Sequence, residues 1–462
     1  MKNSDVIVSN ENIRKAVRRL QVVARDESVL QIAAGMDSQN KPALTAASIS
    51  SDESVQLILY VSTEKNPEEE KDFGVSVRGV DFCSMTDSIL GVDNQGPVSF
   101  SPKGNSIFIK NSASSIKIDL VNRQLKVASM NQEHIKFIGI VGREDLLRLV
   151  KKAGKYGKAA DKVELQNVVW HVNSSEQPAN PDDKSLFLGD LTVTSCSNAA
   201  IGHGKIPTVL MKMGKWDDAV KAYAEQHKEE GTGFDFAVAS SCIDYIANIL
   251  TLTDMEKIQL CVDDKYLHVL FDDSAMLSVR LASKFCDLGA IKQLFSAKAE
   301  SQIVVDMKYF MLATGILNKK RMLNSKLGEH VAIRLISKAD SGKEKEGKGS
   351  LVLKIAENSV EIPIIESTDS PDIDIFFSPA LLNEGFSSQN PGNVIINVLG
   401  DKILLANGGI ESGYTKDATK VLLASIKHSE GEKMEAKFAS GIVEEEDESK
   451  DKSKKKAKDK EG

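Results

Sequence analysis

The chain has few of the residues that mark disulfide-rich or zinc-binding proteins. It contains five cysteines among 462 residues, an odd number, and no two stand at a Cys-x-x-Cys spacing. A disulfide framework or a zinc site is therefore disfavoured, and a reducing compartment fits. We expect each cysteine to be a small buried apolar residue. The five are Cys83, Cys196, Cys242, Cys261 and Cys286.

Long apolar runs are missing as well. The segment from Met1 to Asn10 lacks the apolar core of a signal peptide, and no run approaches the length of a membrane span. We therefore expect a cytoplasmic protein with no membrane partner.

The motifs that catalysis tends to leave are also absent. There is no Gly-x-x-x-x-Gly-Lys-Ser/Thr loop, no His-Glu-x-x-His and no Gly-x-Ser-x-Gly. The seven histidines are scattered, and none stands at helical ligand spacing to another. Acidic pairs such as Asp263-Asp264 could hold a divalent cation, but they stand in polar turns, where solvated side chains are the simpler interpretation. We expect no catalytic residue, no metal and no cofactor, so the chain is predicted not to be an enzyme.

Composition sets the class of protein and its size. Hydrophobic residues make up 41% and charged residues 27%, as in soluble globular proteins. The length suits roughly three domains. A formal net charge of −7 argues against a protein that binds nucleic acid over a uniformly basic surface. Whether the chain binds nucleic acid therefore depends on where its cations are clustered.

One order of elements recurs three times: a basic helix, strands, a more neutral helix and further strands. Such repetition is informative about architecture. The first pair of helices is predicted at Asn12–Arg25 and Asp81–Leu90, and the second at Arg143–Lys158 and Ala239–Leu250. In the third, one helix begins at Asp306 and the other at Ser378-Pro379, a good N-cap followed by a residue suited to the first turn.

The first helix of each repeat, which we call the leading helix, carries a cluster of cations. In the second, Glu144 and Asp145 occupy the first turn, where the helix dipole favours acids, and the bases follow. Three such helices in an acidic protein suggest that one shared surface faces phosphate. The predicted DNA-contacting residues are Arg14, Lys15, Arg18, Arg19, Arg148, Lys151, Lys152, Lys155, Lys158, Lys319, Lys320 and Arg321.

Aromatic residues are scarce, at 5% of the chain. Tyr156 is the only ring among the bases of the second leading helix, so stacking on single-stranded bases is poorly supported. No groove-reading motif is recognisable either. Sequence-independent contact with a duplex backbone remains.

This pattern resembles the bacterial DNA polymerase III beta sliding clamp family over about residues 8–430. Arg280-Leu281 followed by Phe285-Cys286-Asp287 is similar to the family's R-L-x-x-x-x-F-P-D segment, with Cys286 in place of proline. Val304–Leu317 fits the first helix of the family's third domain. Asp374–Leu382 and Leu186–Ile201 are similar to two further family segments.

The resemblance implies an α+β fold of three repeated clamp domains, each with two inner helices and outer antiparallel sheets. Two subunits would close head to tail into a homodimeric ring around double-stranded DNA. The ring would tether a DNA polymerase, and a clamp-loader ATPase would open it. The predicted boundaries are 1–128, 129–298 and 299–430, followed by a disordered charged tail at 431–462.

The chain departs from the family at the partner-binding pocket. The family's Gly-His-Arg-Leu segment corresponds here to residues 197–200, and its C-terminal Met-Pro-Met-Arg-Leu strand to residues 424–428. The implied pocket residues are Asn198, Ala200, Leu422, Leu423 and Ile426. Lys205–Gly233 resembles an insertion with a helical stretch at Trp216–His227, either a partner-binding arm or a packed excursion. Such divergence would suit a bacteriophage clamp, which would lie in the host cytoplasm.

Two alternatives remain open from the sequence. A scaffold or structural protein of repeated α/β domains that does not bind DNA explains the acidic total equally well. An enzyme whose site leaves no recognisable motif is the other.

Overall fold

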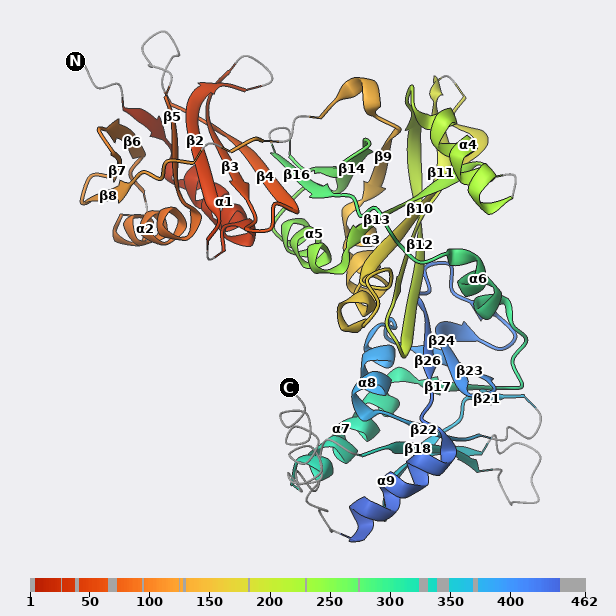
Figure 1. Ribbon diagram of the computed structural model, residues 1–462. Coiled ribbons are helices and arrows are strands. Elements are labelled where there is room, and N and C mark those ends of the chain that lie inside the picture. Colours follow the sequence, from red (N-terminus) through yellow and green to blue (C-terminus); the bar gives the residue numbers. More distant parts are fainter. Residues whose placement is uncertain are drawn as a thin grey trace, which may run out of the picture. The chain divides into compact units, whose positions relative to one another are not determined.

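The chain folds into two compact units, Met1–Leu294 and Phe295–Gly462 (Figure 1). The structure is a computed structural model. It describes residues 5–25, 27–37, 41–64, 73–93, 95–123, 125–127, 130–181, 183–228, 231–272, 275–323, 331–338, 349–368 and 373–440. Each unit combines helices with antiparallel strands, so the predicted α+β class is confirmed.

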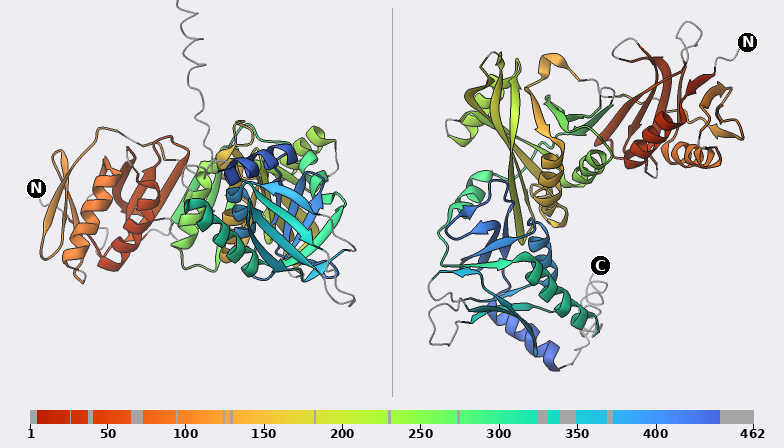
Figure 2. Two further views of the ribbon diagram at one scale, coloured as in Figure 1. Left: turned by 90° about the horizontal axis from the view of Figure 1, so that it is seen from below. Right: turned by 180° about the vertical axis from the view of Figure 1, so that it is seen from behind.

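The first half of unit 1 contains two helices and two antiparallel sheets. Helix α1 begins after Ser9, whose hydroxyl accepts a hydrogen bond from the Asn12 amide at 3.3 Å. Its apolar stripe of Ile13, Val17 and Leu20 is buried. Helices α1 and α2 lie side by side in Figures 1 and 2. The elements are β1 (Val6–Val8), α1 (Asn10–Val23), β2 (Val29–Met36), β3 (Pro42–Ile49), β4 (Val55–Ser62), β5 (Gly74–Arg78), α2 (Gly79–Val92), β6 (Val98–Lys103), β7 (Ser106–Lys110) and β8 (Ser115–Asp119).

The second half of unit 1 repeats this pattern with longer strands and an added helix. Helix α4 occupies Trp216–His227, as the sequence predicts. The elements are η2 (Gln132–His134), β9 (Phe137–Gly142), α3 (Arg143–Lys152), η3 (Tyr156–Ala159), β10 (Asn167–Asn180), β11 (Asp183–Cys196), β12 (Ala200–Lys212), α4, β13 (Gly233–Ala239), η4 (Ser240–Cys242), α5 (Ile243–Thr251), β14 (Lys257–Val262), β15 (Tyr266–Leu270), β16 (Ala275–Arg280) and α6 (Leu288–Ser296).

Unit 2 carries a third pair of packed helices, α7 and α8. Ser378 precedes α8 and Pro379 is its first residue, as predicted. The elements are β17 (Ser301–Asp306), α7 (Met307–Leu323), β18 (Ile333–Lys338), β19 (Ser350–Ile355), β20 (Asn358–Pro363), β21 (Glu366–Ser367), β22 (Asp374–Phe377), α8 (Pro379–Ser387), β23 (Asn393–Leu399), β24 (Lys402–Gly409), β25 (Gly413–Tyr414), β26 (Lys420–Ala424) and α9 (His428–Ser440).

Strand pairing recurs in the same order three times. One set of pairings runs β1-β6-β7-β8, then β9-β14-β15-β16, then β17-β23-β24-β26. The other runs β5-β2-β3-β4, then β13-β10-β11-β12, then β22-β18-β19-β20. The repetition predicted from patterning is therefore present in the topology, although the chain has little residue identity between its repeats.

Main-chain pairing joins the two halves of unit 1. Strand β4 pairs antiparallel with β16, from Val55 opposite Val279 to Leu59 opposite Ala275. These side chains are buried, so the join is part of the core. Residues 1–294 consequently form one compact unit, and the boundary at residue 128 stays a prediction.

One local prediction needs correction and another is confirmed. Helix α3 ends at Lys152 rather than Lys158, and the chain turns into η3. Glycine fits this turn, because a Cβ at position 154 would lie 2.6 Å from the Val150 carbonyl oxygen. The polar stretch Asn173–Lys184, expected as a loop or hairpin tip, forms the tip of the hairpin of β10 and β11, where Asn180 lies opposite Asp183. The backbone pairing of this tip is mainly between β10 and β11, and it does not require apolar side chains.

The predicted charged tail is also shorter than expected. Residues 428–440 form α9, which packs on β22. Gly431 lies against the Phe376 ring, and Glu435 pairs with Lys354 at 2.8 Å and with Arg334 at 3.5 Å. Met434 and Phe438 follow Gly431 at helical spacing, a signal that the surrounding charges obscured. The remaining predicted tail, 441–462, lies outside the described residues.

Four cysteines are buried, as predicted, and Cys286 is half-buried. Burial raises the pKa of Cys83 and of Cys261 to about 12, so both thiols stay protonated at neutral pH. These cysteines therefore act as core residues rather than as nucleophiles.

Replacing Gly431 with valine should weaken the docking of α9. A Cβ at this position would lie 2.3 Å from the Phe376 ring, and overpacking of this kind costs about 1–3 kcal/mol. Hydrogen–deuterium exchange of residues 428–440 should accelerate. Ser429→Val, at an exposed position of the same helix, is the control and should leave exchange nearly unchanged. Equal protection in both variants would contradict the packing of α9.

Candidate nucleic-acid interface

The cations of α1 divide into exposed and internally bonded side chains. Arg18 is exposed, and the described residues form no ion pair with it. Arg14 is half-buried, and its guanidinium donates to the Leu90 carbonyl oxygen at 2.8 Å, at the C-terminal end of α2. Arg14 therefore joins the two helices, which limits its freedom to meet an outside ligand.

Arg19 is buried and paired, although the sequence predicts that it contacts DNA. Its side chain is 7% exposed, its guanidinium bonds to the Asp272 carboxylate, and it lies 5.3 Å from the centre of the Phe271 ring. Asp272 also accepts a hydrogen bond from Thr253 at 3.2 Å. Because the cation is both buried and paired, we remove Arg19 from the residues expected to contact DNA. It holds α1 against the second half of unit 1.

Lys15 is exposed but has acidic neighbours. Its ammonium lies 3.1 Å from Asp254 and 3.8 Å from Asp272. The described part of α1 therefore offers an outside anion one unpaired exposed cation, Arg18, rather than the four that the sequence suggests. Sequence reasoning missed Asp254 and Asp272, because they lie more than 230 residues along the chain from their partners.

The cations of α3 and η3 stay close together although the helix is shorter than predicted. Lys151 is exposed in the last turn of α3, as is usual for cations near the negative end of the helix dipole. Arg148 bonds to Asp145 at 2.8 Å, and Lys158 pairs with Asp244 of α5 at 2.5 Å. Lys155 lies over the Tyr156 ring, 5.3 Å from its centre. Lys152 is half-buried in the same turn as Lys151.

The third cluster lies at the end of α7. Lys319 is exposed. Lys320 and Arg321 belong to the helix, but their side chains lie outside the described residues. Both therefore remain predictions.

The predicted partner-pocket residues are found at two strand ends. In unit 1, Ala200 begins β12 and is buried, whereas Asn198 lies in the exposed turn before it and donates to Asp161. In unit 2, Leu422 and Leu423 are buried in β26, and Leu423 packs against Gly385 of α8. The Ile426 amide donates to the Phe376 carbonyl oxygen at 2.7 Å. The pocket itself stays a prediction.

The described residues contain no group of three or more His, Cys, Asp or Glu side chains suited to a metal ion. None of their helices is long and apolar enough to span a membrane.

Solved DNA clamps share this fold, although no family model and no curated protein matches the sequence. The Bacillus subtilis DNA polymerase sliding clamp matches with a TM-score of 0.68, and the Helicobacter pylori beta clamp with 0.66, each at 12% identity over 92% of this chain and 100% of the other. A Thermotoga maritima DNA polymerase III beta subunit matches with 0.66 at 12% identity, over 92% and 99%. The chain therefore has the beta-clamp fold.

Removing Arg19 should destabilise unit 1. In Arg19→Met the Asp272 carboxylate loses its buried partner, which should cost roughly 2–4 kcal/mol because Asp272 keeps some exposure. Trp170 and Trp216 are the only tryptophans and both are buried in unit 1, so urea unfolding followed by their fluorescence reports on this unit. Arg18→Met, one residue away and exposed, should change stability by less than about 0.5 kcal/mol. Similar losses in both variants would refute the role of the pair.

Proposed function

We propose that the protein is a DNA sliding clamp, a processivity factor that encircles duplex DNA without catalysis of its own. The beta-clamp fold and the three pairs of packed helices support this proposal. A ring of this kind is retained on DNA by topology, so its phosphate contacts should be weak and independent of sequence.

We propose that the ring closes by a contact between copies that resembles the β4–β16 join. In that join β4 is the last strand of the order β5-β2-β3-β4, and β16 is the last strand of the order β9-β14-β15-β16. Among the described strands, β8 and β20 end their sheets at the equivalent positions and have one neighbour each. Unpaired edges are templates for pairing with another chain. Strand β20 of one copy would therefore pair with β8 of a second copy, and two such heterologous contacts close a dimer.

The helices beside these edges both expose apolar side chains. At the join inside unit 1, the leading helix α1 contacts α5, the second helix of the next repeat. The equivalent contact between copies would set α7 against α2. Helix α7 exposes Tyr309, Leu312 and Ile316, at 51%, 61% and 43%, on one stripe. Helix α2 exposes Val80, Met85 and Val92. Exposed apolar patches of this kind mark protein interfaces.

Contact with the duplex would rest mainly on the cluster of α3 and η3, with Arg18 and Lys319 from the other leading helices. Many of the other cations are paired with carboxylates, so the net attraction for phosphate is small. Such weak attraction is compatible with a ring that slides.

The proposed partners are a DNA polymerase and a clamp-loader ATPase. One similar structure, a Helicobacter pylori beta clamp, is described as bound to a DNA ligase peptide. A pocket that includes Asn198, Ala200, Leu422, Leu423 and Ile426 would receive partner peptides here. The proposed location is the cytoplasm of a bacterial cell or of a phage-infected host.

Removing the α3 and η3 lysines should weaken DNA binding. We expect the combined alanine variant of Lys151, Lys152, Lys155 and Lys158 to bind a short open-ended duplex about tenfold more weakly at low salt, with a smaller salt slope because fewer counterions are released. Fluorescence anisotropy across a salt series measures the affinity and its dependence on salt. A matched variant with four exposed lysines elsewhere changed to alanine (Lys103, Lys117, Lys184 and Lys221) should keep the original slope. Equal effects would favour the scaffold alternative.

Charging the α7 stripe should prevent dimer formation. In Leu312→Asp with Ile316→Asp, two carboxylates would have to be desolvated at the proposed interface, so sedimentation velocity should show a monomer where the original chain forms a dimer. Leu188→Asp changes an exposed leucine of β11 and should remain dimeric. A monomeric original chain at every concentration would refute ring closure.

A further inference from the structure

Helix α4 and strand β13 border a cavity of about 450 Å³ in unit 1. This volume lies within the roughly 300–1,000 Å³ typical of ligand pockets. Its floor is apolar and includes Ala219, Ala222 and Tyr223 of α4, Phe234 of β13 and Phe285. Trp216 and Tyr223 fix α4 in place by their burial, so the cavity has a rigid wall.

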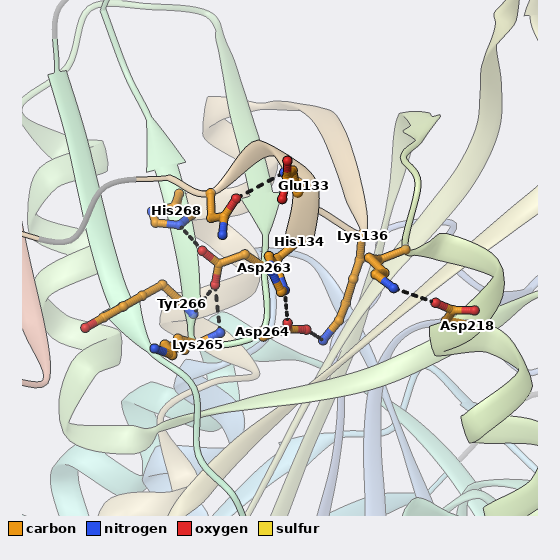
Figure 3. Close-up of polar contacts among 11 residues, drawn as sticks. Glu133, His134, Lys136, Asp218, Asp263, Asp264, Lys265, Tyr266 and His268 are labelled. Atoms are coloured by element: carbon orange, nitrogen blue, oxygen red, sulfur yellow. Dashed lines mark hydrogen bonds and ion pairs between the residues drawn. The ribbon is translucent and has the colours of Figure 1, made fainter.

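Cations and carboxylates at one end of the cavity neutralise each other. Asp264 accepts from His134 at 2.5 Å and pairs with Lys136 at 3.5 Å, as Figure 3 shows. Lys215 pairs with Asp218 at 3.0 Å. The hydrogen bond from His134 and the Lys136 charge hold the pKa of Asp264 below its ordinary value, so this carboxylate stays ionised and engaged. This end offers little uncompensated charge to a ligand.

The other end carries a carboxylate that is only half satisfied. The Asp235 side chain is 4% exposed, and its Oδ1 lies 2.6 Å from His171 Nδ1. No described residue donates to its Oδ2, which is buried. A buried acceptor without a donor is costly and favours a ligand that supplies one. The carboxylate of Asp287 lies 3.6 Å from His227, at the end of α4, and is largely exposed.

We propose that this cavity binds a peptide segment of a partner protein that carries an arginine or lysine side chain beside an apolar one. The cation would donate to Asp235, where no lysine or arginine of the described chain forms an ion pair, and the apolar side chain would cover Ala222 and Phe285. Charge-assisted hydrogen bonds of this kind are among the stronger polar contacts. The site lies within unit 1 and does not depend on ring assembly.

A fluorescein-labelled peptide, GSGLRFGSG, tests the proposal with the full-length chain. Fluorescence anisotropy should show saturable binding. Replacing the arginine with citrulline, which keeps the shape and removes the charge, should weaken binding about tenfold. Asp235→Asn should cause a similar loss, because it removes the carboxylate charge while leaving an oxygen for His171.

Tryptophan substitutions on α4 separate the cavity from the rest of the helix. Ala222 is exposed and lines the cavity, so Ala222→Trp should fill it and weaken binding at least tenfold. Ala224 does not line the cavity, and Ala224→Trp should bind within about twofold of the original chain. Far-UV circular dichroism checks that both variants fold.

Two results would overturn the proposal. One is the absence of saturable binding of the arginine peptide to the original chain. The other is that neither the citrulline replacement nor Ala222→Trp weakens the binding. Sedimentation of the same samples reports ring assembly separately, so failure of this site is distinguishable from failure of the clamp proposal.

Discussion

The antiparallel pairing of β4 with β16 is the interaction on which the larger architecture of unit 1 depends. It continues the main-chain hydrogen bonds of one repeat into the next, and its residues are part of the core. The register of this join is strongly specified, because a shift by one residue would turn the buried side chains outward. Arg19 and Asp272 add a charged contact near the same join, between α1 and the turn that precedes β16. The relative placement of α1 and α5 follows from these two contacts.

Sequence patterning predicted the elements with strong helical periodicity well. Helix α4 was placed to the residue, and α8 was recognised from Ser378 and Pro379. The end of α3 was misplaced, where a close approach of the backbone accompanies a turn. After Lys152 the chain turns, and glycine at position 154 allows its close approach to the Val150 carbonyl oxygen. The helical spacing of the cations in this segment does not reveal the turn at Gly154.

The candidate interface was predicted in outline but not in its charge balance. Counting cations on helical faces located the clusters of α1 and α3. It could not show that Lys15, Arg19 and Lys158 face carboxylates from other segments. A basic face in sequence is therefore an upper bound on the charge available to a ligand. The sequence likewise did not predict that Asp235, in the short strand β13, is buried beside an apolar cavity.

The backbone of Asp272 has a consequence for how this position can vary. Its φ of 56° lies in the left-handed region, which glycine adopts freely and which aspartate and asparagine tolerate better than other residues. Glycine would relax the backbone but leave the Arg19 guanidinium without its carboxylate. Asparagine would tolerate the backbone and lose the charge. The conformational preference and the electrostatic preference of this position thus oppose each other, so in related chains residues 19 and 272 should change together rather than singly.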